Sequence, residues 1–192
     1  MRSPVAELLG ALAAVLDRLG VGWYLFGAQA ALLYGAARLT ADVDVTVDLG
    51  PETPSALVTA LTAAGFEPRA REDLDDFIAR TRVIPLVHLA SGLPLDIVLA
   101  GPGPEEVFLR RTRRHEVDGV PVPVASPEDV VVMKILAGRS KDMEDALAIL
   151  VANRGLDKAL VRDTLGLVER ALDRRDLVPA FEELARRAQQ ED

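Results

Sequence analysis

Residues 26–48 read FGAQAALLYGAARLTADVDVTVD, and the last seven residues of this stretch decide how the chain is interpreted. Asp42, Asp44 and Asp48 alternate there with valines, with Thr46 among them. Successive side chains of a strand point to opposite faces, so we expect the valines in a core and the acids on the other face. Aspartate is a poor strand former, and a divalent cation is the commonest reason to place several on one strand.

The segment before the acids adds a second signal. Residues 23–26 predict a short strand, and Gly27-Ala28 predicts a tight turn into a helix over residues 29–34. Small residues and exposed N–H groups at a helix N-terminus favour phosphate binding. Followed by two acids on the next strand, this turn indicates a site for a metal and a nucleotide.

A third acid is available further along the chain. Asp96 lies in an apolar run over residues 93–100, where its neighbours Leu95 and Ile97 take the opposite face. A lone acid in such a strand is costly unless it is paired or bound to a metal. Asp96 is therefore a candidate third ligand of a two-metal centre, and an ion pair is the alternative.

The rest of the chain predicts a mixed α/β part to about residue 124, followed by helices only. A Ser126-Pro127 cap opens one of these helices. The remaining predicted elements are helices over 4–19, 54–64, 104–111, 127–138, 141–153 and within 156–190, and hairpins over 83–100 and 115–124. We expect a core over residues 1–125 and a helical part over 126–192 packed on it.

Composition narrows the function classes. The chain has 192 residues, 49% of them hydrophobic, a net charge of −8 and no cysteine. These values exclude a disulfide framework and a zinc–thiolate site, and they argue against general adhesion to nucleic acid or anionic membrane. With no signal peptide and no apolar run of bilayer length, the expected location is the cytoplasm.

One dense cationic cluster interrupts the acidic chain: Arg110, Arg111, Arg113, Arg114 and His115. Arginines at a helix end favour the C-terminal dipole, so a solvated helix end is one interpretation. A contact for a phosphate-bearing substrate is the other.

These residues together resemble the nucleotidyltransferase superfamily that includes DNA polymerase beta. The pattern of Gly27, a small residue, a helix and then Arg38-Leu39-Thr40-Ala41-Asp42-Val43-Asp44 is similar to that superfamily. A second block, Lys134 to Asp145 (KILAGRSKDMED), resembles the AbiEii-type bacterial branch, many of whose members are toxins of toxin–antitoxin pairs. The resemblance spans residues 23–150 and implies a mixed sheet flanked by helices, followed by a C-terminal helical part.

The resemblance also implies roles for single residues. Gly27 and Ala28 would approach the triphosphate, Asp42 and Asp44 would hold Mg²⁺ or Mn²⁺, and Asp96 matches the third carboxylate of the wider superfamily. Lys134 would meet nucleotide phosphates and Asp142 would support the site from the facing helix. From the residues themselves, Arg38 and Thr40 either fix the loop before the acids or contact the substrate. We expect Asp48 to be a turn residue, and Lys141 and Asp145 to lie on the helix surface.

Three functions stay open at this point. The first is metal-dependent transfer of NMP from an NTP such as ATP to a hydroxyl of tRNA or protein, by a toxin with an antitoxin partner. The second is a nucleotide-binding or interaction module without catalysis, because Ala28 lacks the hydroxyl of the serine often found there. The third is transfer to a small molecule such as an aminoglycoside, whose positive charge suits an acidic cleft.

Overall fold

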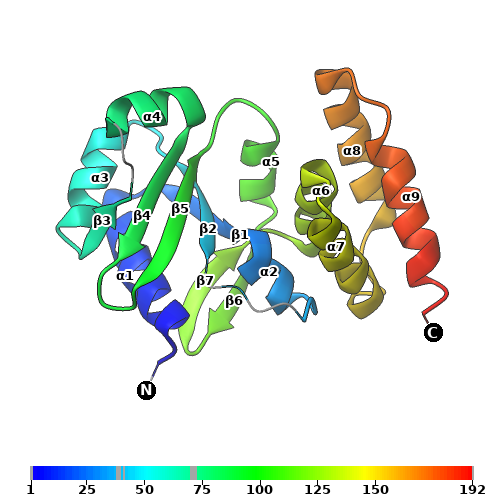
Figure 1. The fold of residues 1–192 in the computed structure, drawn as a ribbon, viewed down its shortest axis with the longest axis horizontal. Coiled ribbons are helices and arrows are strands. Elements are labelled where there is room, and N and C mark those ends of the chain that lie inside the picture. Colours follow the sequence, from blue (N-terminus) through cyan, green and yellow to red (C-terminus); the bar gives the residue numbers. More distant parts are fainter. Residues whose placement is uncertain (1, 38–39, 41, 70–72, 192) are drawn as a thin grey trace. The chain divides into compact units, whose positions relative to one another are not determined.

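The protein was analysed as a computed structural model, which describes residues 2–37, 40, 42–69 and 73–191. Contacts within the chain divide it into two compact units (Figure 1). The first holds residues 1–26 and 40–125, and the second holds residues 27–39 and 126–192. The boundary predicted at residue 125 placed 27–39 in the α/β part, whereas the contacts group this segment with the helices. The domain assignment itself stays a prediction.

The first unit is built on a mixed sheet, which confirms the expected fold class. Its seven described strands follow the order β3-β4-β5-β2-β1-β7-β6. The central strand β2 is antiparallel to β1 and parallel to β5. The strands are β1 Gly22–Phe26, β2 Val43–Asp48, β3 Phe66–Pro68, β4 Val83–His88, β5 Leu93–Leu99, β6 Arg113–Val117 and β7 Val120–Val124.

Alternation along β2 sorts its side chains as predicted. Val43, Val45 and Val47 are fully buried, whereas Asp44 and Asp48 are partly exposed. Helix α1 (Pro4–Leu19) packs against β5 and β7, and α3 (Pro54–Thr62) packs against β3 and α1. These helices close the core and leave the acids outside it.

Two prolines limit how far β7 pairs with β1. The Ala125 N–H donates to the Leu25 carbonyl at 3.0 Å, so this position of the chain points its nitrogen toward β1. Every second residue of a strand points its nitrogen the same way. Counting back from Ala125, the residues that would point a nitrogen toward β1 are Pro123 and Pro121. Proline has no N–H. The register between the two strands accordingly consists of Leu25 opposite Val124.

The sequence patterns left residues 65–82 unassigned, and the structure places two elements there. Strand β3 is only three residues long, too short for alternation to reveal. Helix α4 (Leu74–Thr81) begins at Asp73, whose carboxylate accepts hydrogen bonds from the N–H groups of Asp75 and Asp76. Helix α5 (Pro104–Arg110), also in this unit, matches its prediction to within one residue.

The second unit is helical and is organised around α6 (Pro127–Ala137). Helix α6 contacts each of the other helices of the unit, and most of its residues are buried. Its predicted cap is confirmed, because Ser126 Oγ accepts a hydrogen bond from the Asp129 N–H at 3.1 Å. The other helices are α2 Gly27–Leu33, α7 Ser140–Ala152, α8 Lys158–Leu172 and α9 Leu177–Ala188.

A close approach joins the end of α2 to the end of α7. Gly35 has φ +105°, and a Cβ at this position would lie 2.5 Å from the Ala152 Cβ. The Asn153 side-chain amide donates to the Tyr34 carbonyl at 2.8 Å. Only glycine fits both the backbone conformation and the space at residue 35.

Candidate active site

The three predicted acids of the first unit lie at one end of two neighbouring strands. Asp44 on β2 is directly opposite Asp96 on β5, in a parallel register. Asp42 is exposed and lies one residue before β2, not within it as the alternation predicted, and its N–H donates to Thr40 Oγ1 at 3.3 Å. Residues paired across two strands share a face of the sheet, so this register brings Asp96 beside Asp44.

Asp96 also has a partner that the sequence did not reveal. Arg69, which follows β3, donates from Nη2 to Asp96 Oδ1 at 2.5 Å and from Nε to the Leu86 carbonyl at 2.7 Å. Burial raises the pKa of Asp96, Arg69 opposes that rise, and the charge of Asp42 adds to it.

The donor set is suited to Mg²⁺ or Mn²⁺, which take oxygen ligands and often share carboxylates with substrate phosphates and waters. Asp42 and Asp44 fit such a shared site, since both carboxylates are reached by solvent. Among the described residues, no group of three or more His, Cys, Asp or Glu side chains is arranged to hold an ion by itself. The geometry therefore fits a cation that arrives with further ligands.

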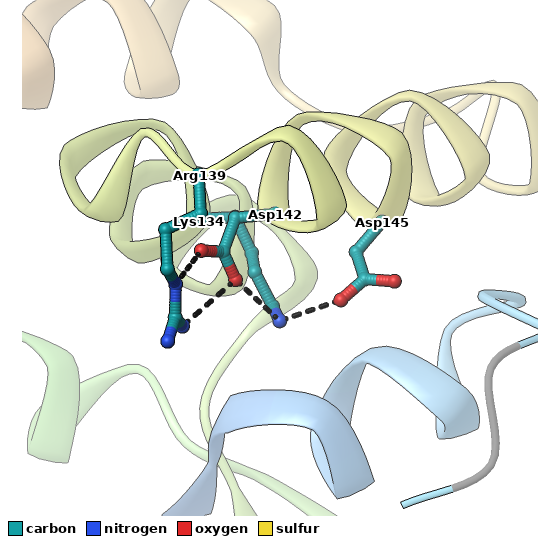
Figure 2. A network of polar contacts seen from close by, with 4 residues as sticks. All are labelled: Lys134, Arg139, Asp142 and Asp145. Atoms are coloured by element: carbon teal, nitrogen blue, oxygen red, sulfur yellow. Dashed lines mark hydrogen bonds and ion pairs between the residues drawn. The ribbon is translucent and has the colours of Figure 1, made fainter.

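The second unit holds a cluster of charges, which comprises Lys134, Arg139, Asp142 and Asp145 (Figure 2). Lys134, Asp142 and Asp145 are buried, whereas the Arg139 side chain is 63% exposed. The Lys134 ammonium lies 3.1 Å from Asp142 Oδ1 and 2.6 Å from Asp145 Oδ2. Arg139 makes two hydrogen bonds to Asp142, through Nε and Nη2. Lys134 and Asp142, paired in the sequence hypothesis, are thus in direct contact.

Burial and pairing act in opposite directions on Asp142. Its carboxyl group is almost fully buried, which alone would raise its pKa. Hydrogen bonds from Arg139 and Lys134 outweigh burial and hold the pKa below its ordinary value. The residue is therefore a carboxylate at neutral pH.

Two neighbouring positions on α7 differ in how well they were predicted. We expected Lys141 and Asp145 on the helix surface, and Lys141 is exposed. Asp145 is only 4% exposed and pairs with Lys134, so its prediction was wrong. The spacing of Asp142 and Asp145 on one helix face contained this signal, because residues three apart are neighbours on a helix.

The predicted phosphate turn belongs to the same unit as this cluster. Helix α2 begins at Gly27, two residues earlier than predicted, and Gly27 has φ +69°. Helix α2 packs against α6 and α7, and Figure 2 shows the charged ends of Lys134 and Arg139 directed toward α2. Of the loop that follows, Arg38 lies outside the described residues, and Thr40 is described only through its contact with Asp42.

Comparisons with known proteins give the family and the fold of the chain. A family model described as "Nucleotidyl transferase AbiEii toxin, Type IV TA system" matches residues 10–192. The chain belongs to the AbiEii nucleotidyltransferase family. No curated relative matches.

Solved structures similar to this AbiEii-family chain are also nucleotidyltransferases. The antibiotic-resistance factor ANT(2'')-Ia has a TM-score of 0.62 at 15% identity, over 90% of this chain and 95% of that one. An antigenic nucleotidyltransferase-like protein from Paracoccidioides brasiliensis has a TM-score of 0.57 at 19% identity, over 92% of this chain and 91% of that one. The lincosamide antibiotic adenylyltransferase LnuA, with lincomycin bound, has a TM-score of 0.52 at 14% identity, over 74% of this chain and 94% of that one. At these identities the likeness shows the fold.

The cationic cluster of this AbiEii-family chain spans two elements. Arg110 ends α5, as the helix-end interpretation requires, but Arg113 and Arg114 lie exposed on β6, at the edge of the sheet. Asp48, expected as a turn residue, accepts a hydrogen bond from the Gly50 N–H at 3.1 Å. None of the helices in the described part of the chain is long and apolar enough to cross a membrane.

Proposed function

We propose that this nucleotidyltransferase moves a nucleoside monophosphate from an NTP to a hydroxyl group of an RNA. A divalent cation shared by Asp42, Asp44 and the nucleotide is part of the proposal. The observation that carries it is the register of β2 and β5, which sets Asp44 beside Asp96 at a solvent-exposed end of the sheet, next to Asp42.

The reaction balances without a further reactant. The acceptor oxygen attacks the α-phosphorus, the bond from that phosphorus to the β-phosphate oxygen breaks, pyrophosphate leaves, and the hydroxyl proton passes to solvent. Such transfers depend mainly on positioning and on neutralising charge. The cation supplies that neutralisation, and the strand carrying Asp44 supplies a rigid base for its ligands.

The residues that the resemblance assigns to the nucleotide in the helical unit are a separate part of the proposal, made for that unit by itself. Gly27 and Ala28 offer backbone N–H groups at the start of α2. Lys134, whose ammonium is paired with Asp142 and Asp145, is proposed to add positive charge near a nucleotide phosphate. Asp142 acts by holding Lys134 and Arg139. Arg38 and Thr40 are proposed to contact the nucleotide from the connecting loop.

The arginines of β6 favour RNA as the acceptor. Arg113 lies opposite Val124, Val124 opposite Leu25, and Leu25 opposite Val45, the residue that follows Asp44. The basic edge is therefore level with the acids, and β1 and β7 lie between β6 and β2, so three strand spacings of about 4.8 Å put β6 at roughly 14 Å from β2. A phosphate backbone that crosses β6 would reach the acids within a few nucleotides.

The family description motivates a biological role as well. We propose that the chain is the toxin of a toxin–antitoxin pair, with an antitoxin as its partner. Induced expression of the wild type, compared with Asp44→Asn, tests this role through growth. Arrest by the wild type alone supports it, and equal growth of both strains contradicts it.

Transfer is tested with NTPs labelled at the α-phosphate, beginning with ATP, in the presence of Mg²⁺ and total RNA. We expect labelled RNA from the wild type and from Asp48→Asn, and none from the double variant Asp42→Asn, Asp44→Asn. Parallel reactions contain protein extract or an aminoglycoside. Label in the drug or in protein instead of RNA would contradict the proposed acceptor, and binding of nucleotide without transfer to any acceptor would contradict catalysis.

The proposed contact between RNA and the arginines of β6, Arg113 and Arg114, has its own test. Arg113→Ala with Arg114→Ala removes two phosphate contacts, so the slope of log affinity against log salt should become shallower by about 1.4 to 1.8. Arg186→Ala with Arg187→Ala makes the same change in net charge on α9, where both side chains are exposed, and serves as the control. Equal slopes for the two double variants would remove β6 from the RNA contact.

A further inference from the structure

Helix α8 has two opposite faces that share one spacing. The inner face packs against α6 and α9 (Figure 1), and its buried residues are Val161, Thr164, Leu165 and Val168. On the other side of the helix the same spacing recurs in Asp163, Gly166, Leu167 and Arg170, which we call the outer face. Residues at i, i+3, i+4 and i+7 form one continuous face of a helix. The outer face is open to solvent, with only Gly166 half-buried.

The outer face borders a groove between α8 and α9. The residues that line this groove are Arg162, Asp163, Gly166, Leu167, Arg170 and Val178. Leu167 lies in the middle of the face and is 61% exposed. A single exposed leucine is ordinary on a protein surface, so Leu167 alone identifies no partner. The residues on either side of it do.

Gly166 has no steric reason within its own chain. It lies in the interior of α8, where glycine is less stable than alanine. Its backbone is not in the left-handed conformation, and among the described residues a Cβ there would meet Arg170 Nη1 alone, at an ordinary 3.5 Å. A glycine on an exposed helix face allows another backbone to approach closely. The position therefore suits packing against a second helix.

Asp163 and Arg170 give the two ends of the outer face opposite charges. Neither side chain forms a hydrogen bond or an ion pair with another described residue, whereas Arg162 beside them is paired with Glu182 at 2.5 Å. The two residues are equally far in sequence from the midpoint between Gly166 and Leu167. A second α8 placed antiparallel about this midpoint would set its Arg170 opposite Asp163. It would also set its Leu167 opposite Gly166, so the face is complementary to itself under a two-fold rotation.

We propose that the outer face of α8 is the contact between two copies of this chain, related by a two-fold axis that passes between Gly166 and Leu167. Leu167 of each copy packs over Gly166 of the other, and Asp163 and Arg170 form an ion pair at each end. One helix face is a small area for an interface, so the dimer is reversible and depends on concentration. The contact uses no residue of the candidate active site and goes beyond the proposed function.

Reversal of single charges tests the pairing. Sedimentation velocity over a wide range of protein concentrations measures the equilibrium between monomer and dimer. We expect a concentration-dependent dimer for the wild type. Asp163→Arg and Arg170→Asp should each raise the Kd by at least about tenfold, because like charges would then face each other at both ends of the contact. Arg187→Asp reverses an exposed charge on α9 and should leave the Kd unchanged.

A mixture of the two charge variants gives the sharper result. In a pair of Asp163→Arg with Arg170→Asp, both arginines of the first chain face aspartates of the second. The equimolar mixture should therefore form dimers with a Kd near that of the wild type, although neither variant does so alone. Mixing would not restore a dimer that forms through another surface, nor binding of a different protein to this face.

Gly166→Ala separates dimer formation from folding. Alanine favours the helix and its Cβ fits within the chain, so the urea midpoint of the monomer should rise. The added methyl group lies where Leu167 of the other copy packs, so the Kd of the dimer should rise as well. Gly155→Ala, at a glycine with open space around it, is the control and should leave the Kd unchanged.

Three results would overturn the proposal once circular dichroism has confirmed that the variants are folded. The first is a wild-type chain that stays monomeric at every concentration, which would leave the outer face to a different partner. The second is a dimer whose Kd is unaffected by Asp163→Arg, Arg170→Asp or Gly166→Ala. The third is a mixture of the two charge variants that remains monomeric, which would contradict the two-fold pairing.

Discussion

The acids at the end of β2 and β5 and the charged cluster on α6 and α7 differ in how far water reaches them. Asp42 is exposed and the Asp96 side chain is 39% exposed, whereas Lys134 is 5% and Asp142 1% exposed. The cluster is also neutral within itself, since its two cations face two carboxylates.

This difference separates two uses of the same residue types. Buried charges that neutralise each other hold neighbouring helices in a fixed arrangement, and removing one leaves its partner uncompensated. Carboxylates that solvent reaches contribute less to folding, and a cation from solution can reach them. We therefore expect substitutions in the cluster to act first on stability and substitutions at the acid end to act first on chemistry.

The largest effect on stability should come from Lys134→Met, which leaves Asp142 and Asp145 without their shared ammonium. Breaking a buried ion pair by removing one partner costs about 3 to 5 kcal/mol. Equilibrium unfolding in urea measures this loss. Lys141→Met removes an exposed lysine of α7, the helix that carries Asp142 and Asp145, and should stay within about 0.5 kcal/mol of the wild type. Equal stability of the two variants would show that the buried cluster does not hold the helices.

A smaller effect on stability is expected at Gly35, which follows α2 and lies against Ala152 at the end of α7. Gly35→Ala would place a methyl group 2.5 Å from Ala152 Cβ at φ +105°. Strain of this kind and overpacking each cost about 1 to 3 kcal/mol. Gly50→Ala is the matched control after β2, because it shares a positive φ but has open space around it, and it should cost about 1 kcal/mol. A loss at Gly50 equal to that at Gly35 would mean that backbone strain, not packing, dominates.

The pH dependence of stability should follow Asp142. Its pKa is lower in the folded protein than the ordinary 3.8, despite the opposing effect of burial, because Arg139 and Lys134 stabilise its charge. A lowered carboxyl pKa contributes stability above the unfolded pKa, and this contribution is lost as the pH falls through the folded pKa. Urea midpoints measured downward from about pH 5 should therefore fall less steeply for Asp142→Asn than for the wild type. Identical pH profiles would contradict this assignment.

The two regions also differ in how well the sequence predicted them. The burial of the valines of β2 and the helix cap at Ser126 follow from local patterns, and both predictions are confirmed. Asp145 was misplaced on the surface because its burial depends on Lys134 eleven positions earlier. Arg69 lies 27 positions before Asp96, and only the pairing of β3, β4 and β5 brings them together, so no spacing in the sequence pointed to it.

The most direct test of this account combines labelled nucleotide transfer with urea unfolding for Asp44→Asn. We predict that transfer falls by at least about 100-fold, as expected when a group that stabilises the transition state is lost. Its free energy of unfolding should change by no more than about 1 kcal/mol, because the Asp44 side chain is only partly buried. Transfer at the wild-type rate by folded Asp44→Asn would contradict the account and place the chemistry elsewhere in the molecule.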